Sequence, residues 1–324
     1  MQRPPRASGS TARVLTLWEL ASEIMSDRTL PGGNRDISIA VGNGTGSSFK
    51  PWLRFATGTP LLAHDVVAGG IEMAFLNPSG CLTQAYRGTG LFSEPLPVRV
   101  VATYPSWDRF VMVVHERTGI GSVAELKERQ YPLRVSVREN VTHSTRVLVD
   151  QMLAFHGFSL ADIESWGGSL QLIGSPSDPR RMQGIADGEI EAVFDEGIGG
   201  WLSVALAAGM RPIALGEETL GHLEAIGWRR AVVPAERVAG LDADYVGIDF
   251  SGWPLYTRAS LADETAYRVC AAFHARADAI PWEEGAYTGI GQLGRDTEAT
   301  PLDVPLHPGA EQWYKQHQGT ALDP

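Results

Sequence analysis

Apolar and polar residues follow two different periods along this chain. Short apolar runs rich in Val, Ile and Phe alternate with segments whose apolar residues recur every three or four positions. The runs predict buried strands, and the longer segments predict amphipathic helices. We expect strands over 37–41, 69–76, 98–104, 109–115, 133–137, 170–173, 192–194, 212–215, 231–233 and 244–256. We expect helices over 13–27, 51–68, 81–86, 123–128, 146–156, 179–187, 201–208, 262–274 and around 311–317.

This alternation of strands and helices predicts an α/β fold with largely parallel sheets. At 324 residues the chain is long enough for roughly two lobes. In open α/β sheets a ligand lies beyond the carboxyl ends of the strands. Small or polar residues follow four expected strands, at 42–48, 77–80, 138–145 and 195–199. Together these four loops predict a ligand cleft.

The glycine-rich stretch at residues 42–51, GNGTGSSFKP, is the most distinctive of the four. Glycine allows a sharp turn and close approach of a ligand, and a helix start offers free N–H groups to an anion. A Rossmann fingerprint would need glycine where Ser47 stands, and no G-K-[ST] follows for a Walker loop. An anion-binding loop and an ordinary strand-to-helix turn both remain open.

Composition limits the classes of partner that the protein can bind. The net charge of -11 argues against nucleic acid and anionic membranes, and the 44% hydrophobic content is that of a globular protein. Two cysteines, Cys81 and Cys270, favour buried free thiols over a disulfide framework. Glu19 and Glu23 interrupt the N-terminal apolar stretch, which therefore predicts an amphipathic helix and, as written, a cytoplasmic protein. A start further upstream would allow a periplasmic one.

Several motifs carry a family resemblance. Residues 42–51 are similar to a T-G-G-T-G-G-x-Y-Y-P loop, with Phe49 and Lys50 in place of the tyrosines. A G-I-x-S-x-x-D-L-K segment is matched by residues 119–127, and an S-G-T-[ER] helix start by residues 143–146. Residues 71–74 and 187–192 match an "iDiA" strand and a "dG-x-i-D-A" segment. In this order, the segments resemble the type II periplasmic-binding-protein architecture, and more closely the TAXI family of solute-binding proteins that serve TRAP transporters.

This resemblance implies a two-lobed fold that closes by hinge motion on a small carboxylated organic ligand, without a cofactor. Its partners would be that ligand and TRAP membrane permease subunits. From strand order we expect lobe 1 to hold residues 37–114 plus 246–324 and lobe 2 to hold 115–245. Residues 1–36 would be an N-terminal extension that carries the amphipathic helix.

The candidate ligand-binding residues come from the ends of the expected strands. Backbone amides and hydroxyls at two helix starts would hold an anion, and Lys50 would neutralise it. His143 offers either a neutral donor or a titratable group, Asp195 stands in an acidic pair with Glu196, and Trp253 would form a wall. The full set is Gly44, Thr45, Gly46, Ser47, Ser48, Lys50, Asn77, Ser79, His143, Ser144, Thr145, Asp195 and Trp253.

Two other functions stay open at this point. Enzymes such as dihydroxyphthalate decarboxylases share the architecture, so fold alone does not decide function. A decarboxylase-like enzyme acting on an aromatic or aliphatic carboxylate would use His143 for acid–base chemistry. A cytoplasmic ligand sensor would use the N-terminal helix to contact a partner. No His/Cys/Asp spacing typical of a metal site occurs.

Overall fold

A computed structural model describes residues 16, 20, 37–45 and 48–317. The chain divides into two units, residues 1–35 and residues 36–324. The amphipathic helix expected over 13–27 therefore lies outside the described residues, except for residues 16 and 20, and so do Gly46 and Ser47. Every strand and helix from Ile37 onward belongs to the second unit.

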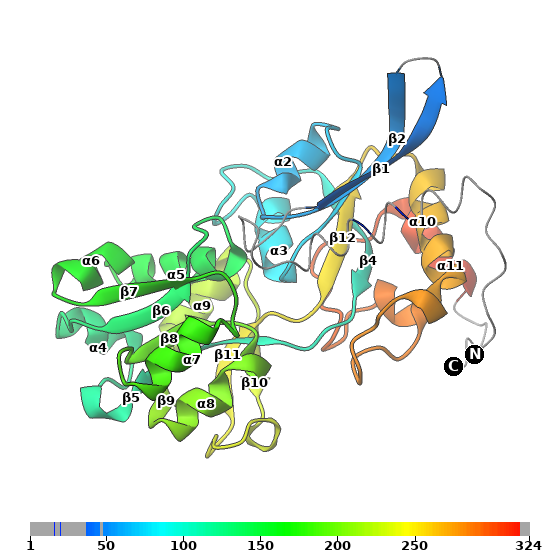
Figure 1. Cartoon of the computed structure of the whole chain (residues 1–324). Coiled ribbons are helices and arrows are strands. Elements are labelled where there is room, and N and C mark those ends of the chain that lie inside the picture. The colour runs from blue at the N-terminus through cyan, green and yellow to red at the C-terminus, as the bar shows by residue number, and fades with distance from the viewer. Residues whose placement is uncertain (1–15, 17–19, 21–36, 46–47, 318–324) are drawn as a thin grey trace. The chain divides into compact units, whose positions relative to one another are not determined.

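The described strands form two sheets (Figure 1). The first sheet has the order β1-β2-β3-β12-β4, with β1 at Ile37–Thr45, β2 at Ser48–Thr57, β3 at Met73–Phe75, β12 at Trp253–Arg258 and β4 at Val98–Tyr104. The second has the order β10-β11-β5-β8-β6-β7, and β9 also pairs with β5. Its strands are β10 Arg230–Val233, β11 Tyr245–Asp249, β5 Arg109–His115, β8 Ala192–Asp195, β6 Arg134–Arg138, β7 Ser169–Ile173 and β9 Met210–Pro212.

Helices fill most of the connections between these strands. Those that follow strands of the first sheet, or lie in the C-terminal region, are α2 Leu62–Val67, α3 Ser79–Arg87, α10 Asp263–Ala275 and α11 Pro308–His317. Those between strands of the second sheet are α4 Val123–Glu128, α5 Ser144–Phe155, α6 Leu160–Ser165, α7 Pro179–Ala186, α8 Leu202–Ala207 and α9 Glu217–Ile226. Ser122 starts α4 as its sequence predicts, because its side chain accepts a hydrogen bond from the Glu125 N–H.

The predicted α/β class with two sheets is confirmed, but the sheets are mixed. Strand β12 lies between β3 and β4 and runs antiparallel to both; Figure 1 shows it beside β4. Strand β5 is likewise antiparallel to both β8 and β11. The parallel pairs are β2 with β3, β6 with β7 and β6 with β8.

The glycine-rich stretch is not a strand-to-helix loop, and this prediction was wrong. Strands β1 and β2 pair antiparallel as a hairpin, with Thr45 opposite Ser48, so residues 51–57 are extended and helix α2 begins only at Leu62. The sequence of β2, SFKPWLRFAT, explains the error. Phe49, Leu53 and Phe55 lie at alternate positions, a period-two pattern that favours a strand although the exposed Trp52 is out of phase with it, and Leu53 is buried.

The chain passes between the two sheets twice, at adjacent places. Residues 105–108 connect β4 to β5, and residues 250–252 connect β11 to β12. Arg109 pairs with Asp249 on one side of these connections, and Tyr104 pairs with Trp253 on the other. Strand β5 and most of β11, which the expected boundaries assign to lobe 1, therefore pair in the second sheet. The lobe boundaries themselves stay a prediction.

One hydrophobic cluster contains residues from both sides of these connections. It includes Leu76 and Leu82 beside the first sheet, Phe110 and Leu148 of the second, and Phe250 between them, all buried. A second hydrophobic cluster lies under α10 and α11, and a third lies under α8. Cys81 and Cys270 are buried free thiols, as expected. Within the described part of the chain, every helix is too short or too polar to cross a bilayer.

Replacing Gly247 by alanine tests the close contact between β11 and β5. An added Cβ would lie 2.4 Å from the Phe110 carbonyl oxygen, so we expect Gly247→Ala to lower the free energy of unfolding by about 1–3 kcal/mol. The matched control is Gly221→Ala in α9, where the new Cβ meets open space and removal of a helical glycine stabilises by about 1 kcal/mol. Urea denaturation measures both. Equal stabilities for the two variants would contradict this packing.

Candidate functional site

The carboxyl ends of both sheets meet where the chain crosses. Strands β3 and β4 run the same way, because both are antiparallel to β12. In the second sheet β6, β7 and β8 end at one edge, and β5 begins there because it is antiparallel to β8. The connection from β4 to β5 thus joins the two carboxyl edges. We call this region the junction; it comprises residues 104–109, residues 249–253 and the loops after β3, β6 and β8.

Asp108 is the central residue of the junction. Its carboxylate accepts hydrogen bonds from the Gly197 N–H (2.8 Å) and the Arg109 N–H (2.7 Å). Its backbone carbonyl accepts from the Phe250 N–H (3.1 Å), and its N–H donates to Ser251 Oγ (3.1 Å). One residue therefore holds both chain connections and the loop after β8.

Asp195 ends β8 inside a buried ion network. Its Oδ1 lies 2.9 Å from Arg138 Nε and its Oδ2 lies 2.6 Å from Arg181 Nη1. Arg138 also pairs with Glu196, and Arg181 Nε donates to Ser136 Oγ (3.1 Å). Because both oxygens of the fully buried Asp195 are taken by arginines, the geometry gives this residue a structural position within the network.

Glu196 and Asp108 are the other two carboxyl groups of this network. Burial raises the pKa of Glu196 well above its ordinary value, and the neighbouring Asp108 and Asp195 raise it further. Burial also raises the pKa of Asp108, which shares a hydrogen bond with Glu196. Both shifts favour a proton held between these two groups over a third negative charge beside Arg138 and Arg181.

His143 starts helix α5 beside this network. Its Nδ1 accepts the Thr145 N–H at 3.2 Å, so a neutral ring carries its proton on Nε2. Burial lowers the pKa of His143 to about 4, and Arg138 acts in the same direction. At neutral pH His143 is therefore an uncharged hydrogen-bond donor.

The starts of helices α3 and α5 carry unpaired polar atoms. Asn77, before α3, has a buried Oδ1 that finds no hydrogen-bond partner among the described residues, and the same holds for Oγ1 of the fully buried Thr145 in α5. Ser79 and Ser144 are buried at the first positions of the two helices. Neither helix has an acidic residue in its first turn. Such ends retain a positive potential.

Other contacts join these two helices. The Gln84 and Gln151 side chains, one from each helix, hydrogen-bond at 3.1 Å. Gln151 also accepts from Trp228 Nε1 at 2.7 Å, and the ring of Trp228 lies against Gly80 in α3. Residues after β3 and after β6, which the sequence places in separate loops, therefore belong to one packed region.

The predicted residues in the hairpin lie elsewhere. Strand β2 runs parallel to β3, so its start at Ser48 lies at the edge of the first sheet opposite Asn77. Seven residues separate Ser48 from Phe55, which pairs with Met73, and this corresponds to roughly 23 Å of extended strand. The structure therefore does not bring Gly44, Thr45, Ser48 and Lys50 together with the junction. Gly46 and Ser47 are outside the described residues.

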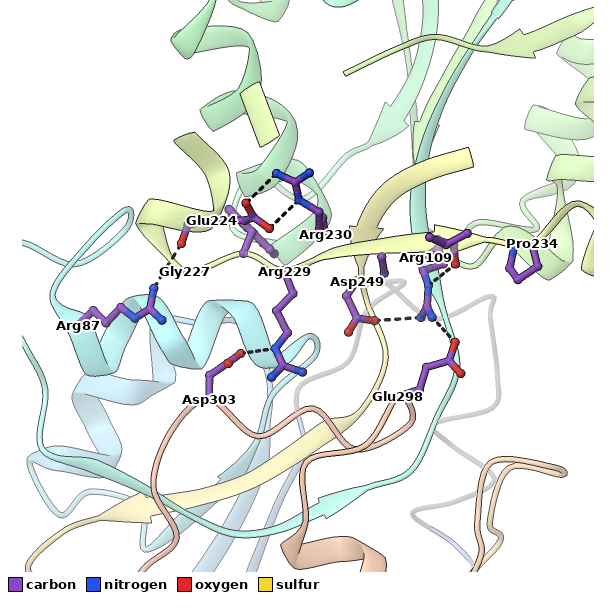
Figure 2. Close-up of a pocket in the computed structure, with 13 residues that line it drawn as sticks. Arg87, Arg109, Glu224, Gly227, Arg229, Arg230, Pro234, Asp249, Glu298 and Asp303 are labelled. Carbon is purple, nitrogen blue, oxygen red and sulfur yellow. Dashed lines mark hydrogen bonds and ion pairs between the residues drawn. The ribbon is translucent and has the colours of Figure 1, made fainter. Parts of the chain in front are cut away.

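A pocket of about 520 Å³ opens beside the junction (Figure 2). Its lining combines Arg87, Arg109, Arg229 and Arg230 with Glu224, Asp249, Glu298 and Asp303. It includes none of the predicted ligand-binding residues. Burial raises the pKa of Asp249.

Most of the charges in this pocket are already paired. Figure 2 shows Arg109 between Asp249 and Glu298, at 3.0 and 2.6 Å, and Arg229 directed at Asp303, at 2.7 Å. The pairs with Glu298 and Asp303 connect the second sheet and its neighbouring residue Arg229 to the C-terminal segment after η5, a 3-10 helix at Ile290–Gly294. We interpret the ion pairs in the pocket wall as contacts that stabilise the junction.

The sequence alone missed the buried network. Arg138 carries a partial signal, because a charged residue directly after Val137 ends an apolar strand. Arg181 carries none, since its place in a polar helix looks like an exposed position. Among the described residues, no group of three or more His, Cys, Asp or Glu side chains is arranged to hold a metal ion.

One protein-family model matches this sequence. The model of the NMT1-like family matches residues 63–317, most of the chain. The chain belongs to the NMT1-like family. No curated protein matches it.

Several solved structures align with the chain at low similarity. They include the alkanesulfonate-binding protein SsuA from Xanthomonas axonopodis pv. citri bound to MOPS, with 16% identity, a TM-score of 0.30, and 80% of this chain and 70% of that one covered. XAC2383 from Xanthomonas citri bound to chloride ion aligns with 11% identity, a TM-score of 0.39, and 79% and 78% covered. Lactococcal OpuAC complexed with glycine betaine aligns with 10% identity, a TM-score of 0.36, and 80% and 82% covered. At these scores the alignments carry no argument about function.

Removing the charge of Asp195 tests the buried network. Asp195→Asn leaves Arg181 without a counter-ion and Arg138 with Glu196 alone, so we expect the free energy of unfolding to fall by about 3–5 kcal/mol. Asp150→Asn breaks an exposed i,i+4 pair with Arg146 and is the matched control, with an expected change below about 0.5 kcal/mol. Urea denaturation compares the two. A mild effect at Asp195 would mean that the network is not formed.

The pH dependence of stability tests the environment of His143. Its pKa is about 4 in the folded protein and about 6.5 in the unfolded chain, so the unfolded chain binds more protons between these values. Stability should therefore fall as the pH drops from 6.5 towards 4, by about 2 kcal/mol from this group. His143→Asn, which keeps a side-chain cap, should lose that part of the pH dependence. His222→Gln in α9 should retain it, and identical profiles for wild type and His143→Asn would refute the assignment.

Proposed function

We propose that this protein captures a small organic carboxylate at the junction, between the starts of helices α3 and α5. The observation that carries the proposal is the buried, unpartnered hydroxyl of Thr145, which can donate to a carboxylate oxygen; the unpartnered Asn77 Oδ1 is an acceptor and would take a donor group of the ligand or a water. Leaving a buried polar group unpaired costs about 1–3 kcal/mol, so such atoms are rare unless a ligand or water completes them. Both sit at helix starts that follow strands β3 and β6.

The electrostatic potential of the site favours an anion, although the attraction does not come from a formally positive side chain. The positive ends of α3 and α5 are not offset by acidic residues in their first turns. Within the buried network, Arg138 and Arg181 are already paired with carboxylates. A carboxylate is therefore bound by fixed dipoles and hydroxyls, which is compatible with the overall charge of -11.

The surroundings of His143 favour a role in ligand binding over a role in catalysis. Its Nδ1 is occupied by the Thr145 N–H, and its lowered pKa keeps the ring neutral at pH 7. The remaining Nε2–H is a donor for a carboxylate oxygen. A general base would instead need a free, unprotonated nitrogen directed at the substrate.

The segment order supports a more specific assignment. It is similar to the TAXI family, so we propose capture of the ligand by hinge closure and delivery to TRAP permease subunits. Closure would remove water and strengthen the contacts made by fixed dipoles. Delivery to a permease would require a periplasmic location.

Thr145→Val separates binding from stability. Valine has the shape of threonine but no hydroxyl, so the variant should lose affinity for carboxylates by about tenfold, while the unliganded protein melts at the same or a higher temperature. The measurement is thermal shift with acetate, succinate, glutamate and benzoate. If none of these raises the melting temperature of the wild type, the proposal is wrong.

Thr219→Val is the matched control. Thr219 is also buried, but its Oγ1 is 2.9 Å from His156 Nε2. This variant should lose stability and keep its affinity for carboxylates. The opposite pattern in the two variants would show that Thr145 is a structural residue.

A further inference from the structure

Strand β1 forms an open edge of the first sheet. It is the outermost strand in the order β1-β2-β3-β12-β4, and within the described part of the chain β2 is its one partner strand. The opposite edge is covered, because Val100 of β4 donates its N–H to the Pro305 carbonyl at 3.0 Å and accepts from the His307 N–H at 2.8 Å. The backbone groups of β1 that point away from β2 are therefore available to a further strand.

The sequence of β1 lacks two features that usually keep such an edge from pairing. Residues 37–45 read ISIAVGNGT and contain no charged residue and no proline. The register against β2 shifts between Val41 and Gly42, which bends the strand at that point. The regular part of the edge is therefore residues 37–41.

Exposed apolar side chains line one face of this edge. Ile39 is 37% exposed and Val41 is 43% exposed. They lie opposite Phe55 and Leu53 of β2, and residues in directly opposite positions point to the same face of a sheet. Leu53 belongs to the buried cluster under α10 and α11, and Phe55 packs against that cluster. Ile39 and Val41 thus continue this apolar layer to the edge of the sheet, where they are open to solvent.

Charge and symmetry favour a second copy of this chain as the partner of this edge. The net charge of -11 opposes the approach of two copies, but this opposition is smallest at an uncharged strand such as residues 37–41. A basic partner would gain no ion pair there. A two-fold axis perpendicular to the sheet pairs β1 antiparallel with itself and keeps Ile39 and Val41 of both copies on one face. The apolar layers of the two copies then become continuous.

We propose that β1 is a dimerisation edge, at which residues 37–41 pair antiparallel with the same residues of a second copy. Ala40 lies at the two-fold axis, so Ile39 is opposite Val41 of the second copy. The paired segment covers about 17 Å of strand, a small contact that gives reversible association. The hairpin lies away from the junction, so the dimer leaves the proposed ligand site free and this inference does not rest on the proposed function.

Sedimentation equilibrium of the full chain tests the association. Over protein concentrations of about 1 to 300 µM, the mass should rise from 35.0 kDa towards twice that value. Ile39→Lys should keep the monomer mass, because it puts a charge into the apolar layer on both sides of the axis. Val204→Lys is the matched control, since Val204 is 45% exposed on α8, and it should associate like the wild type.

A cysteine in place of Ala40 tests the register. Opposite residues of antiparallel strands have Cα atoms about 4.5–5.5 Å apart, which is within reach of a disulfide. The natural Cys81 and Cys270 are buried, so mild oxidation of Ala40→Cys should give a covalent dimer on a non-reducing gel. Leu172→Cys, at a 43% exposed position of the edge strand β7, should stay monomeric on the same gel.

Three results would overturn the inference. A wild type that stays at 35.0 kDa throughout would mean that another segment or another protein covers β1. A dimer that survives Ile39→Lys would use a different surface, and a dimer without the Ala40→Cys cross-link would have a different register. Circular dichroism verifies that each variant is folded. Thermal shift with benzoate should be the same for Ile39→Lys and the wild type, so a failure here is separate from a failure of carboxylate capture.

Discussion

Asp108 makes the contacts on which the junction depends. It is a short side chain in a four-residue connection, yet it is hydrogen-bonded to the other connection through Ser251 and Phe250 and to the loop after β8 through Gly197. Raised pKa values at Asp108 and Glu196 reduce the repulsion among the three carboxyl groups that lie beside two arginines.

The buried network also bears on the anion binding that we propose for this acidic protein. Arg138 and Arg181 both pair with Asp195 inside it, although the buried Nη2 of Arg181 has no hydrogen-bond partner among the described residues. Attraction then comes from helix ends and neutral donors, whose direction is fixed by the fold. Selectivity in such a site depends more on shape and hydrogen-bond geometry than on total charge.

Local patterns in the sequence predicted much of the fold. Strands β4 and β5 and helix α4 have the bounds that their apolar runs and the Ser122 cap predict. Asn77, His143 and Thr145 were placed at strand ends for the same reason. Helices α6 and α9 were missed because one is a short turn with a capping box and the other begins with two glutamates and contains Gly221. The hairpin was missed because its glycines outweighed the period-two pattern of β2.

The parts of the fold and of the site that the sequence did not predict depend on pairs of residues far apart in the chain. Arg138 and Asp195 are 57 positions apart, and Asp108 and Gly197 are 89 apart, so no local window contains either pair. The stack of Trp253 on Tyr104 likewise requires the β4–β12 register. Periodicity predicts which face of an element is buried, but it does not predict which buried charges meet.

The two adjacent connections also determine how the sheets can move. Two short strands that pass side by side between two bodies oppose twisting and sliding, because either motion would stretch the Tyr104–Trp253 or the Arg109–Asp249 pairing. Rotation about the line through both connections leaves these two pairings intact, but it has to break the Gln84–Gln151 hydrogen bond and separate part of the hydrophobic cluster that both sheets share. It requires backbone changes at few residues, among them Gly252, which has φ of +67°. A small rotation about this line would alter the separation of the α3 and α5 starts in proportion to their distance from it, while each sheet keeps its own hydrogen bonds.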